Sequence, residues 1–331
     1  MTRYSILDQV PLYTGVSSEE TLSRLTEFAQ AADANGYTRI WFAEHHNSRG
    51  FISSAPDIMA AHVLAHTERI RVGTGGVMAM NYGSLQIAER FNLLASLYPD
   101  RVDLGLGRAP GTDMLAAAAL NQGRTIGVPE INDIILETAA FIRADVPKDS
   151  PYAMLHAFPT PATAPQLWML GSSGSSATWA AHHGFNYAYA QFFSGSQDEH
   201  LMDAYRSQLP EGVEGTNLSA VSVMAAETEE EAQHYALSAL NFRYRLARGL
   251  PVQFKHPDEI AADEEYATRL RTMLVGNRHM FVGTYDDVAA RLEAFAQETA
   301  TDELMMVTYC ADNQAKIRSI TELSQRLIAS A

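Results

Sequence analysis

Glu44, His45 and His46 are the residues of this chain whose types and spacing best suit proton transfer. They follow the apolar residues 40–43, which show no polar alternation and so predict a strand covered on both faces. Successive strand side chains point to opposite faces, so we expect one imidazole to face a pocket while Glu44 or the other histidine supports it from outside. The same alternation argues against a metal site built from both histidines, and we predict no metal. A single histidine is more often structural, but three titratable residues at a strand end favour a function.

A second candidate is the Gly-Thr-Gly-Gly segment at residues 73–76, which contains Gly75 and Gly76. Glycine inside a strand marks a bulge, or a place where a flat group approaches the backbone closely. A tight corner of a barrel explains the segment equally well. The residues alone do not decide between these two interpretations.

Arg108 is the third candidate, because it stands between Gly107 and Gly111 at the end of another predicted strand. A guanidinium held there can bind a phosphate or a carboxylate through two parallel hydrogen bonds. The alternative is a simple ion pair with a neighbouring acidic residue.

The fourth candidate is the Gly-Ser-Ser-Gly-Ser-Ser segment at residues 171–176, which follows a predicted strand and begins a predicted helix. Free N–H groups, the positive end of the helix dipole and the serine hydroxyls of the segment together suit a phosphate. The segment is neither a P-loop nor a dinucleotide-binding glycine motif. An ordinary serine cap of a helix is the alternative.

Composition limits the classes of function. The chain has 331 residues, with 24 basic and 39 acidic side chains, so its formal charge is 24 − 39 = −15. Such a charge opposes binding to nucleic acid or to anionic lipid. No apolar run reaches the length of roughly 18 residues that a membrane span needs, and no signal peptide is evident. The one cysteine, Cys310, excludes an internal disulfide, so we expect a cytoplasmic protein. Cys310 and Asp8 lie at predicted strand ends, but their patterns assign them no role.

These candidates need a scaffold that brings strand ends together. Eight predicted strands alternate with helices, at residues 5–10, 37–46, 69–78, 101–106, 166–170, 186–192, 218–226 and 303–309. Helical patterns occupy residues 18–36, 54–66, 84–97, 130–143, 173–183, 197–208, 228–248, 257–273, 284–298 and 313–330. No linker divides the chain, so one domain over residues 1–331, an α/β fold of the (β/α)₈ TIM-barrel type with insertions, is the most economical architecture. A doubly wound sheet is the alternative.

With these stretches placed, the chain resembles the bacterial luciferase-like family of flavin monooxygenases. The resemblance rests on Glu-His-His at 44–46, Val-Gly-Thr-Gly-Gly-Val-Met at 72–78 and Gly-Leu-Gly-Arg-Ala-Pro-Gly-Thr-Asp at 105–113. Phe-Val-Gly-Thr at 281–284 and Asp-Glu-Leu-Met-Met at 302–306 also match. Each piece is weak, but the combination is specific and spans nearly the whole chain. Residues 145–165 and 228–275 do not follow the family pattern closely.

The resemblance implies a (β/α)₈ barrel that binds reduced flavin mononucleotide (FMN) at the carboxyl ends of its strands. His45 corresponds to the catalytic histidine of such proteins. Gly75 and Gly76 correspond to a non-prolyl cis peptide against which the isoalloxazine ring packs. Gly107 and Arg108, together with the hydroxyls of Ser172, Ser173 and Ser176, correspond to the flavin phosphate site.

The implied activity is monooxygenation. Reduced FMN, supplied by a separate flavin reductase, would react with O₂ to give a C4a-(hydro)peroxyflavin that oxygenates a small organic substrate. A homodimer is expected from the family alone.

Two other functions remain open. The first is hydride transfer with the deazaflavin F420, without oxygen chemistry, and the second is flavin binding without turnover. A metal-dependent hydrolase is disfavoured by the alternation of the two histidines.

Overall fold

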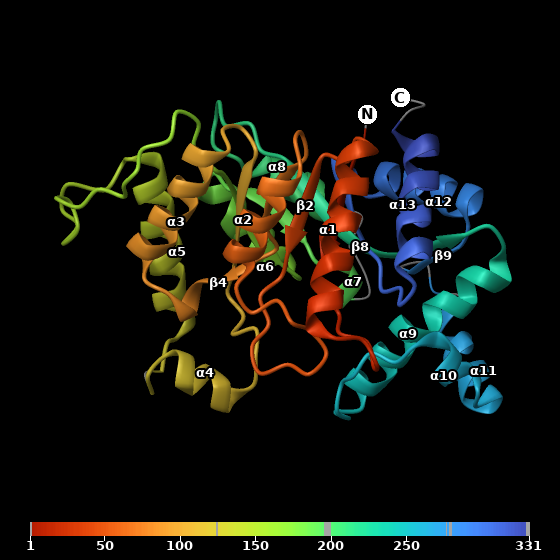
Figure 1. Cartoon of the computed structure of the whole chain (residues 1–331). Coiled ribbons are helices and arrows are strands. Elements are labelled where there is room, and N and C mark those ends of the chain that lie inside the picture. Colours follow the sequence, from red (N-terminus) through yellow and green to blue (C-terminus); the bar gives the residue numbers. More distant parts are fainter. Residues whose placement is uncertain (1, 124, 195–199, 276, 278–279, 329–331) are drawn as a thin grey trace.

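The protein is a closed parallel barrel surrounded by helices (Figure 1). The structure is a computed structural model that describes residues 2–123, 125–194, 200–275, 277 and 280–328. Eight strands form the barrel: β1 (Arg3–Asp8), β2 (Arg39–Phe42), β3 (Arg71–Thr74), β5 (Val102–Gly107), β6 (Gln166–Gly171), β7 (Asn186–Tyr189), β8 (Asn217–Ala226) and β10 (Glu303–Val307). They pair in this order, and β10 pairs with both β8 and β1, which closes the ring.

Two further strands lie outside this ring. The short strand β4 (Val77–Met78) follows β3 and pairs with the end of β5. Strand β9 (Met280–Thr284) pairs with the last five residues of β8, beyond the point where β8 leaves the barrel.

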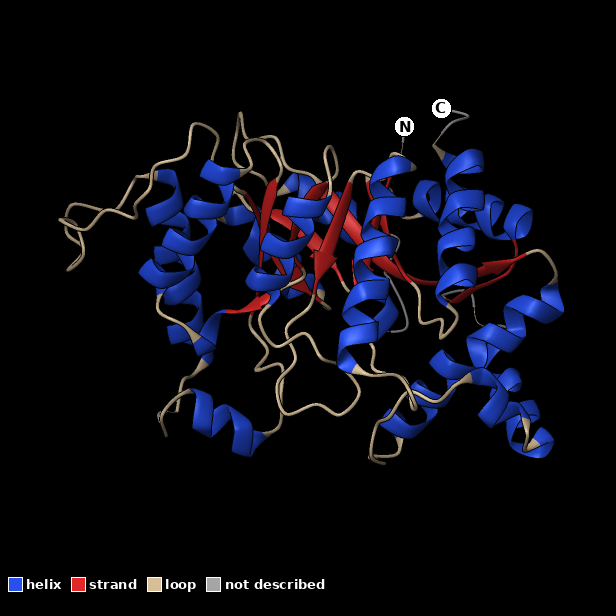
Figure 2. Cartoon of the chain, in the orientation of Figure 1, coloured by secondary structure: helices blue, strands red, loops and turns tan. Residues whose placement is uncertain are grey.

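Helices cover the outside of the barrel and one of its ends (Figure 2). They are α1 (Ser18–Ala34), α2 (Pro56–His66), α3 (Ser84–Leu97), α4 (Met114–Leu120), α5 (Val128–Arg143), α6 (Gly174–His182), α7 (Gln191–Ser194), α8 (Leu201–Ser207), α9 (Glu229–Ala247), α10 (Pro257–Ala261), α11 (Glu264–Arg271), α12 (Tyr285–Glu298) and α13 (Asn313–Leu327), with 3₁₀ turns η1 (Ala79–Asn81) and η2 (Thr272–Leu274). No helix in the described ranges is both long and apolar enough to cross a membrane.

Local sequence explains several helix starts. The side chain of Ser17 accepts a hydrogen bond from the Glu20 N–H at the start of α1, and Thr228 does the same for Glu231 at the start of α9. Such caps satisfy backbone donors that a helix leaves unpaired at its first turn.

A buried ion-pair network fixes the amino-terminal end of the barrel. Arg39 on β2 lies 2.7 Å from a carboxylate oxygen of Asp103 on β5 and 2.7 Å from one of Glu303 on β10. Arg71 binds the second oxygen of Asp103, and the Trp41 indole N–H donates to Asp103 as well. The network joins four strands, β2, β3, β5 and β10, across the inside of the barrel.

The predicted (β/α)₈ barrel is confirmed, and the open doubly wound sheet is excluded because the ring closes. Several predicted bounds were wrong. Strand β2 covers only the middle of residues 37–46, and the predicted strand at 69–78 is divided into β3 and β4 by residues 75–76. The predicted helix at 257–273 is three short segments, and α4 and β9 were missed. Residues 197–199 and 329–330, at the ends of two predicted helices, lie outside the described ranges.

Candidate active site

The four candidate segments lie at the same end of the barrel. His45 comes three residues after β2, Gly75 directly after β3, Arg108 directly after β5 and Ser172 directly after β6. These strands are consecutive neighbours, and all pair in parallel, so their carboxyl ends form one continuous rim. The loops that leave this rim lie on the lower side of the barrel in Figure 2.

Glu44 organises the part of the rim between β2 and β4. Its fully buried carboxylate lies 2.7 Å from His46 Nε2 and accepts hydrogen bonds from the Met78 backbone N–H, Asn81 Nδ2 and Tyr82 O–H. Four partners saturate the carboxylate and fix the turn that follows Gly75 and Gly76. Glu44 and His46 therefore pair with each other and with the β4 turn, and their predicted support of His45 stays a prediction.

His45 faces the other way. Its ring stacks on Phe51 with 4.3 Å between ring centroids, and its backbone N–H donates to the Ser53 carbonyl. Its buried Nδ1 has no hydrogen-bond partner among the described residues. Burial, reinforced by the nearby His46, lowers the pKa of His45 to about 4. The imidazole is therefore neutral at physiological pH and keeps a free polar atom.

We expect the wild type to lose more stability between neutral pH and acid than a His45→Asn variant loses, because of this neutral imidazole. Between the ordinary histidine pKa of 6.5 and about 4, the unfolded ring binds a proton that the folded ring does not, so the free energy of unfolding falls as pH falls through that window. At about pH 5 this group removes about 2 kcal/mol relative to neutral pH. Urea denaturation of both proteins at the two pH values measures the effect. A difference between the proteins that does not change with pH would contradict it.

Gly75 and Gly76 are joined by a cis peptide bond, as expected from the resemblance. A Cβ atom on Gly76 would lie 2.8 Å from the Gly105 carbonyl oxygen, and one on Gly75 would lie 3.0 Å from both Leu7 and Trp41. Neither position accommodates a side chain without movement of its neighbours. The segment therefore presents bare backbone at the rim.

Arg108 is partly buried and forms no hydrogen bond or ion pair with any residue in the described ranges. The expected alternative of an ion pair with a neighbouring acidic residue is therefore not seen there. Its charge acts on Tyr187: burial raises the pKa of Tyr187, and the Ser176 hydroxyl and the Arg108 charge oppose that rise. Gly107, which precedes it, is buried and pairs with Met78.

The serine segment lies beside Arg108. The Tyr187 hydroxyl donates to the Ser173 carbonyl and lies 3.1 Å from Ser176 Oγ, so this tyrosine joins the two parts of the site. Ser172 and Ser173 are exposed at the start of α6, and Ser173 occupies the cap position without a side-chain cap hydrogen bond. Ser176 is buried, and its hydroxyl donates to the Ser173 carbonyl. It supports the turn, and its predicted contact with a phosphate stays a prediction.

The comparison with known proteins decides the family. Residues 2–303 match the family model described as luciferase-like monooxygenase. The chain belongs to the luciferase-like monooxygenase family. It is 32% identical to the N-acetyl-S-alkylcysteine monooxygenase of Bacillus subtilis (strain 168), over 100% of this chain and 99% of that protein. It is also similar to the crystal structure of apo-MsnO8, with 31% identity, a TM-score of 0.87 and 98% of each chain covered.

More distant structures share the fold of this luciferase-like chain. One is a type II Baeyer-Villiger monooxygenase from Pseudomonas putida in complex with FMN, at 16% identity and a TM-score of 0.72, covering 99% of this chain and 98% of that one. Another is an F420-dependent secondary alcohol dehydrogenase, at 13% identity and a TM-score of 0.73, and the match covers 98% of this chain and 99% of that one. The fold alone therefore does not distinguish between the two cofactors.

An aromatic cluster completes the mouth of the luciferase-like barrel. Phe254 contacts Phe51, Phe242, Tyr309 and Tyr13, with ring centroids 4.8 to 5.5 Å apart. Phe51 also stacks on the His45 ring, so the aromatic cluster contacts the candidate catalytic residue. The sequence did not reveal this cluster, because its members come from four distant segments and share no period.

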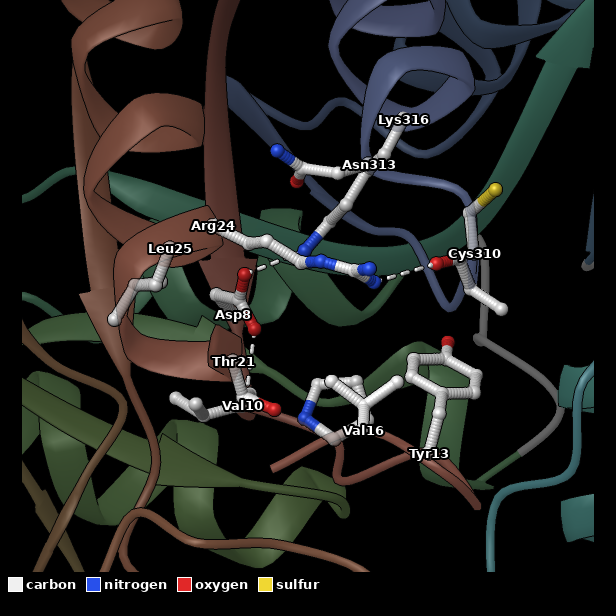
Figure 3. Close-up of a pocket in the computed structure, with 12 residues that line it drawn as sticks. Asp8, Val10, Tyr13, Val16, Thr21, Arg24, Leu25, Cys310, Asn313 and Lys316 are labelled. Carbon is white, nitrogen blue, oxygen red and sulfur yellow. Dashed lines mark hydrogen bonds and ion pairs between the residues drawn. The ribbon is translucent and has the colours of Figure 1, made fainter. Parts of the chain in front are cut away.

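Asp8 and Cys310 line a small cavity beside the mouth, between α1 and α13 (Figure 3). Asp8 accepts from the Val10 N–H and lies 2.6 Å from Lys316 Nζ, so it is a structural ion pair. Burial raises the pKa of the Cys310 thiol to about 12, which leaves it protonated and a poor nucleophile. Within the described ranges, no group of three metal-binding side chains occurs in the luciferase-like barrel.

Proposed function

We propose that this luciferase-like chain is an FMN-dependent monooxygenase, which uses reduced FMN from a separate flavin reductase and O₂ to oxygenate a small organic substrate. One observation carries the proposal: an arginine without an acidic partner and a serine-lined helix start share one corner of the rim. Bare glycine backbone and a neutral histidine continue the same rim.

The corner suits a phosphate. Arg108 lies in a protein with a formal charge of −15, yet no described carboxylate pairs with it. The exposed hydroxyls of Ser172 and Ser173 and the first N–H groups of α6 lie on the next strand end. A helix start of this kind attracts anions through its free donors and its dipole.

The glycine segment suits a flat ring. Gly75 and Gly76 present no side chains; Leu7 and Trp41 pack against Gly75, and Gly105 and Leu170 pack against Gly76. Glu44 accepts a hydrogen bond from the Met78 N–H in the turn that follows Gly75 and Gly76. This hydrogen bond fixes the position of the glycine backbone, which we call the glycine floor. A planar ring placed there would contact backbone without displacing a side chain.

The bound flavin would supply the electrons with which O₂ is activated. The protein's own part is to position the flavin and the substrate, to shield the reacting centre from water, and to hold a proton there. His45, neutral at working pH, can donate or accept a hydrogen bond through its free Nδ1 atom. The aromatic cluster beside it excludes water from the reacting centre.

The test is oxygen incorporation. The purified protein with NADH, a flavin reductase, FMN and isotopically labelled O₂ should transfer one labelled oxygen atom to its substrate. N-acetyl-S-alkylcysteines are the first compounds to assay, because a relative over the whole chain is named for them. Turnover with F420 and no uptake of O₂ would replace the proposal with hydride transfer. Tight flavin binding with neither reaction would favour a protein that only binds the cofactor.

Changing His45 to alanine should leave FMN affinity within about twofold but accelerate the uncoupled oxidation of reduced FMN by O₂, which releases hydrogen peroxide, by roughly 100-fold, the lower end of the range for one positioned proton-transfer group. The physical reason is that the alanine variant lacks both the polar Nδ1 atom and the ring that packs on Phe51. Stopped-flow reoxidation of bound reduced FMN and the yield of hydrogen peroxide measure this.

The matched control is His62→Ala, which removes a histidine on α2 that pairs with Thr26 away from the rim. Reoxidation at the wild-type rate in His45→Ala would remove His45 from the proposed mechanism.

We also propose a cytoplasmic homodimer. Apolar side chains exposed on the neighbouring helices α2 and α3, namely Ile58, Leu93 and Leu97, support a protein–protein contact on that side. Sedimentation of the purified protein tests it.

A further inference from the structure

Arg243 on α9, like Arg108, forms no ion pair with an acidic side chain in the described ranges. Its Nη2 donates to the Phe192 carbonyl at 2.7 Å. The side chain is partly buried. Burial lowers the pKa of Arg243, and the nearby Tyr309 opposes that shift. A guanidinium taken out of water with one neutral partner is costly to keep, unless it binds an anion in the working protein.

The aromatic cluster connects Arg243 to the candidate catalytic group. The charge of Arg243 acts on the Tyr309 hydroxyl, and the Tyr309 ring lies 6.4 Å from Phe51 and 5.7 Å from Phe242 between ring centroids. Phe51 in turn stacks on His45 at 4.3 Å. An apolar wall therefore begins beside the guanidinium and ends at the imidazole.

A second polar group without a partner lies at the same turn. Gln191 is fully buried, and neither its amide nitrogen nor its amide oxygen has a hydrogen-bond partner among the described residues. It directly precedes Phe192, whose carbonyl receives the hydrogen bond from Arg243. Buried amides are almost always paired, so an unpaired one in the turn that receives the Arg243 hydrogen bond favours a place where a polar ligand group binds.

This place adjoins the proposed phosphate corner, since the Ala190 N–H donates to the Gly171 carbonyl, but it is built from other residues. Arg108 follows β5 and faces the serine turn after β6, whereas Gln191 follows β7 and Arg243 lies on the helix after β8. If Arg108 holds the flavin phosphate, that phosphate is not available to Arg243. A different anion would then have to bind Arg243.

We propose that Arg243 and Gln191 bind the carboxylate of the substrate, whose apolar part lies along the aromatic cluster toward His45. The inference rests on the proposed function, and it names the substrate class: small carboxylic acids with an apolar or aromatic group at the other end. The guanidinium and the amide can both donate hydrogen bonds to one carboxylate. The apolar wall favours substrates whose remaining part is apolar, because that part buries its surface against the aromatic side chains.

The experiment measures binding rather than turnover, so that it can succeed or fail independently of the oxygenation reaction. Phenyl-substituted alkanoic acids of increasing chain length are titrated by calorimetry into the FMN-loaded protein, each beside its primary amide. The wild type should bind the best acid at least about tenfold more tightly than the matching amide, as expected for one charge-assisted pair. Arg243→Gln should abolish that preference, and Arg243→Lys should restore part of it.

The matched control is Arg248→Gln, which removes the same charge from the end of the same helix, where the guanidinium stacks on Tyr244. It should keep the preference for acids. Arg243→Gln should also melt no lower than the wild type, because it removes a desolvated charge; a structural arginine would lower the melting temperature. Wild-type protein that shows no preference for any acid, or Arg243→Gln that retains it, would overturn the assignment, whatever the oxygenation assay shows.

Discussion

Replacing Arg108 with alanine is expected to weaken FMN binding by roughly 10- to 100-fold while leaving riboflavin binding almost unchanged. The estimate corresponds to about 1.5–3 kcal/mol, the usual contribution of a hydrogen bond to a charged group. The reason is that Arg108 has no described carboxylate partner and lies beside the serine turn, so its charge is available to a phosphate that riboflavin lacks. Fluorescence titration of both flavins measures the two affinities.

Arg49→Ala is the control for this change. Arg49 is exposed in the loop after β2, so its removal alters the net charge of the same side of the barrel without touching the proposed phosphate corner. It should change neither affinity by more than about twofold, the scale of a screened surface charge. An equal loss of FMN and riboflavin in Arg108→Ala would show that Arg108 acts on the ring or on the fold instead.

Arg39→Met is expected to lower the free energy of unfolding by roughly 3–5 kcal/mol, the usual cost of removing one partner from a buried ion pair. Two fully buried carboxylates, Asp103 and Glu303, would lose their common cation. Arg71 would still hold Asp103, which places the loss mainly on Glu303. Chemical denaturation followed by circular dichroism measures the change.

Arg3→Met removes another arginine from the same glutamate and serves as its control. Arg3 lies 3.5 Å from Glu303, but its side chain is 44% exposed, so its loss should cost no more than about 1 kcal/mol. If the two variants lost equal stability, burial would not be what gives the Arg39 network its strength.

The sequence predicted the barrel because each barrel strand left a local signal. Apolar runs bounded by helix patterns located the eight strands, and parallel pairing then required their carboxyl ends to meet. His45, Gly75 and Arg108 could be placed on one rim for this reason alone, since strand order and direction determine where a strand end lies.

Other features depend on contacts between distant segments, so no local pattern predicts them. The aromatic cluster draws on residues as far apart as Phe51 and Tyr309. Ser176 was assigned to the phosphate site from the family resemblance, but its hydroxyl is buried against Tyr187 and the Ser173 carbonyl. Strand β9 was missed because the barrel was already complete with eight strands, and Arg243 was missed because an arginine within a helix usually faces water.

The long excursion from α9 to α11 carries Phe242, Arg243 and Phe254, whereas the glycine floor and the serine turn belong to the ends of β3 and β6. Close packing forbids side chains on that floor, whereas the excursion packs on Phe51 in the loop after β2 through Phe242 and Phe254. The sequence of the excursion can therefore change among relatives while the glycine floor and the serine turn keep their structure. A lineage of this architecture can diversify what it oxidises while its redox centre stays unchanged.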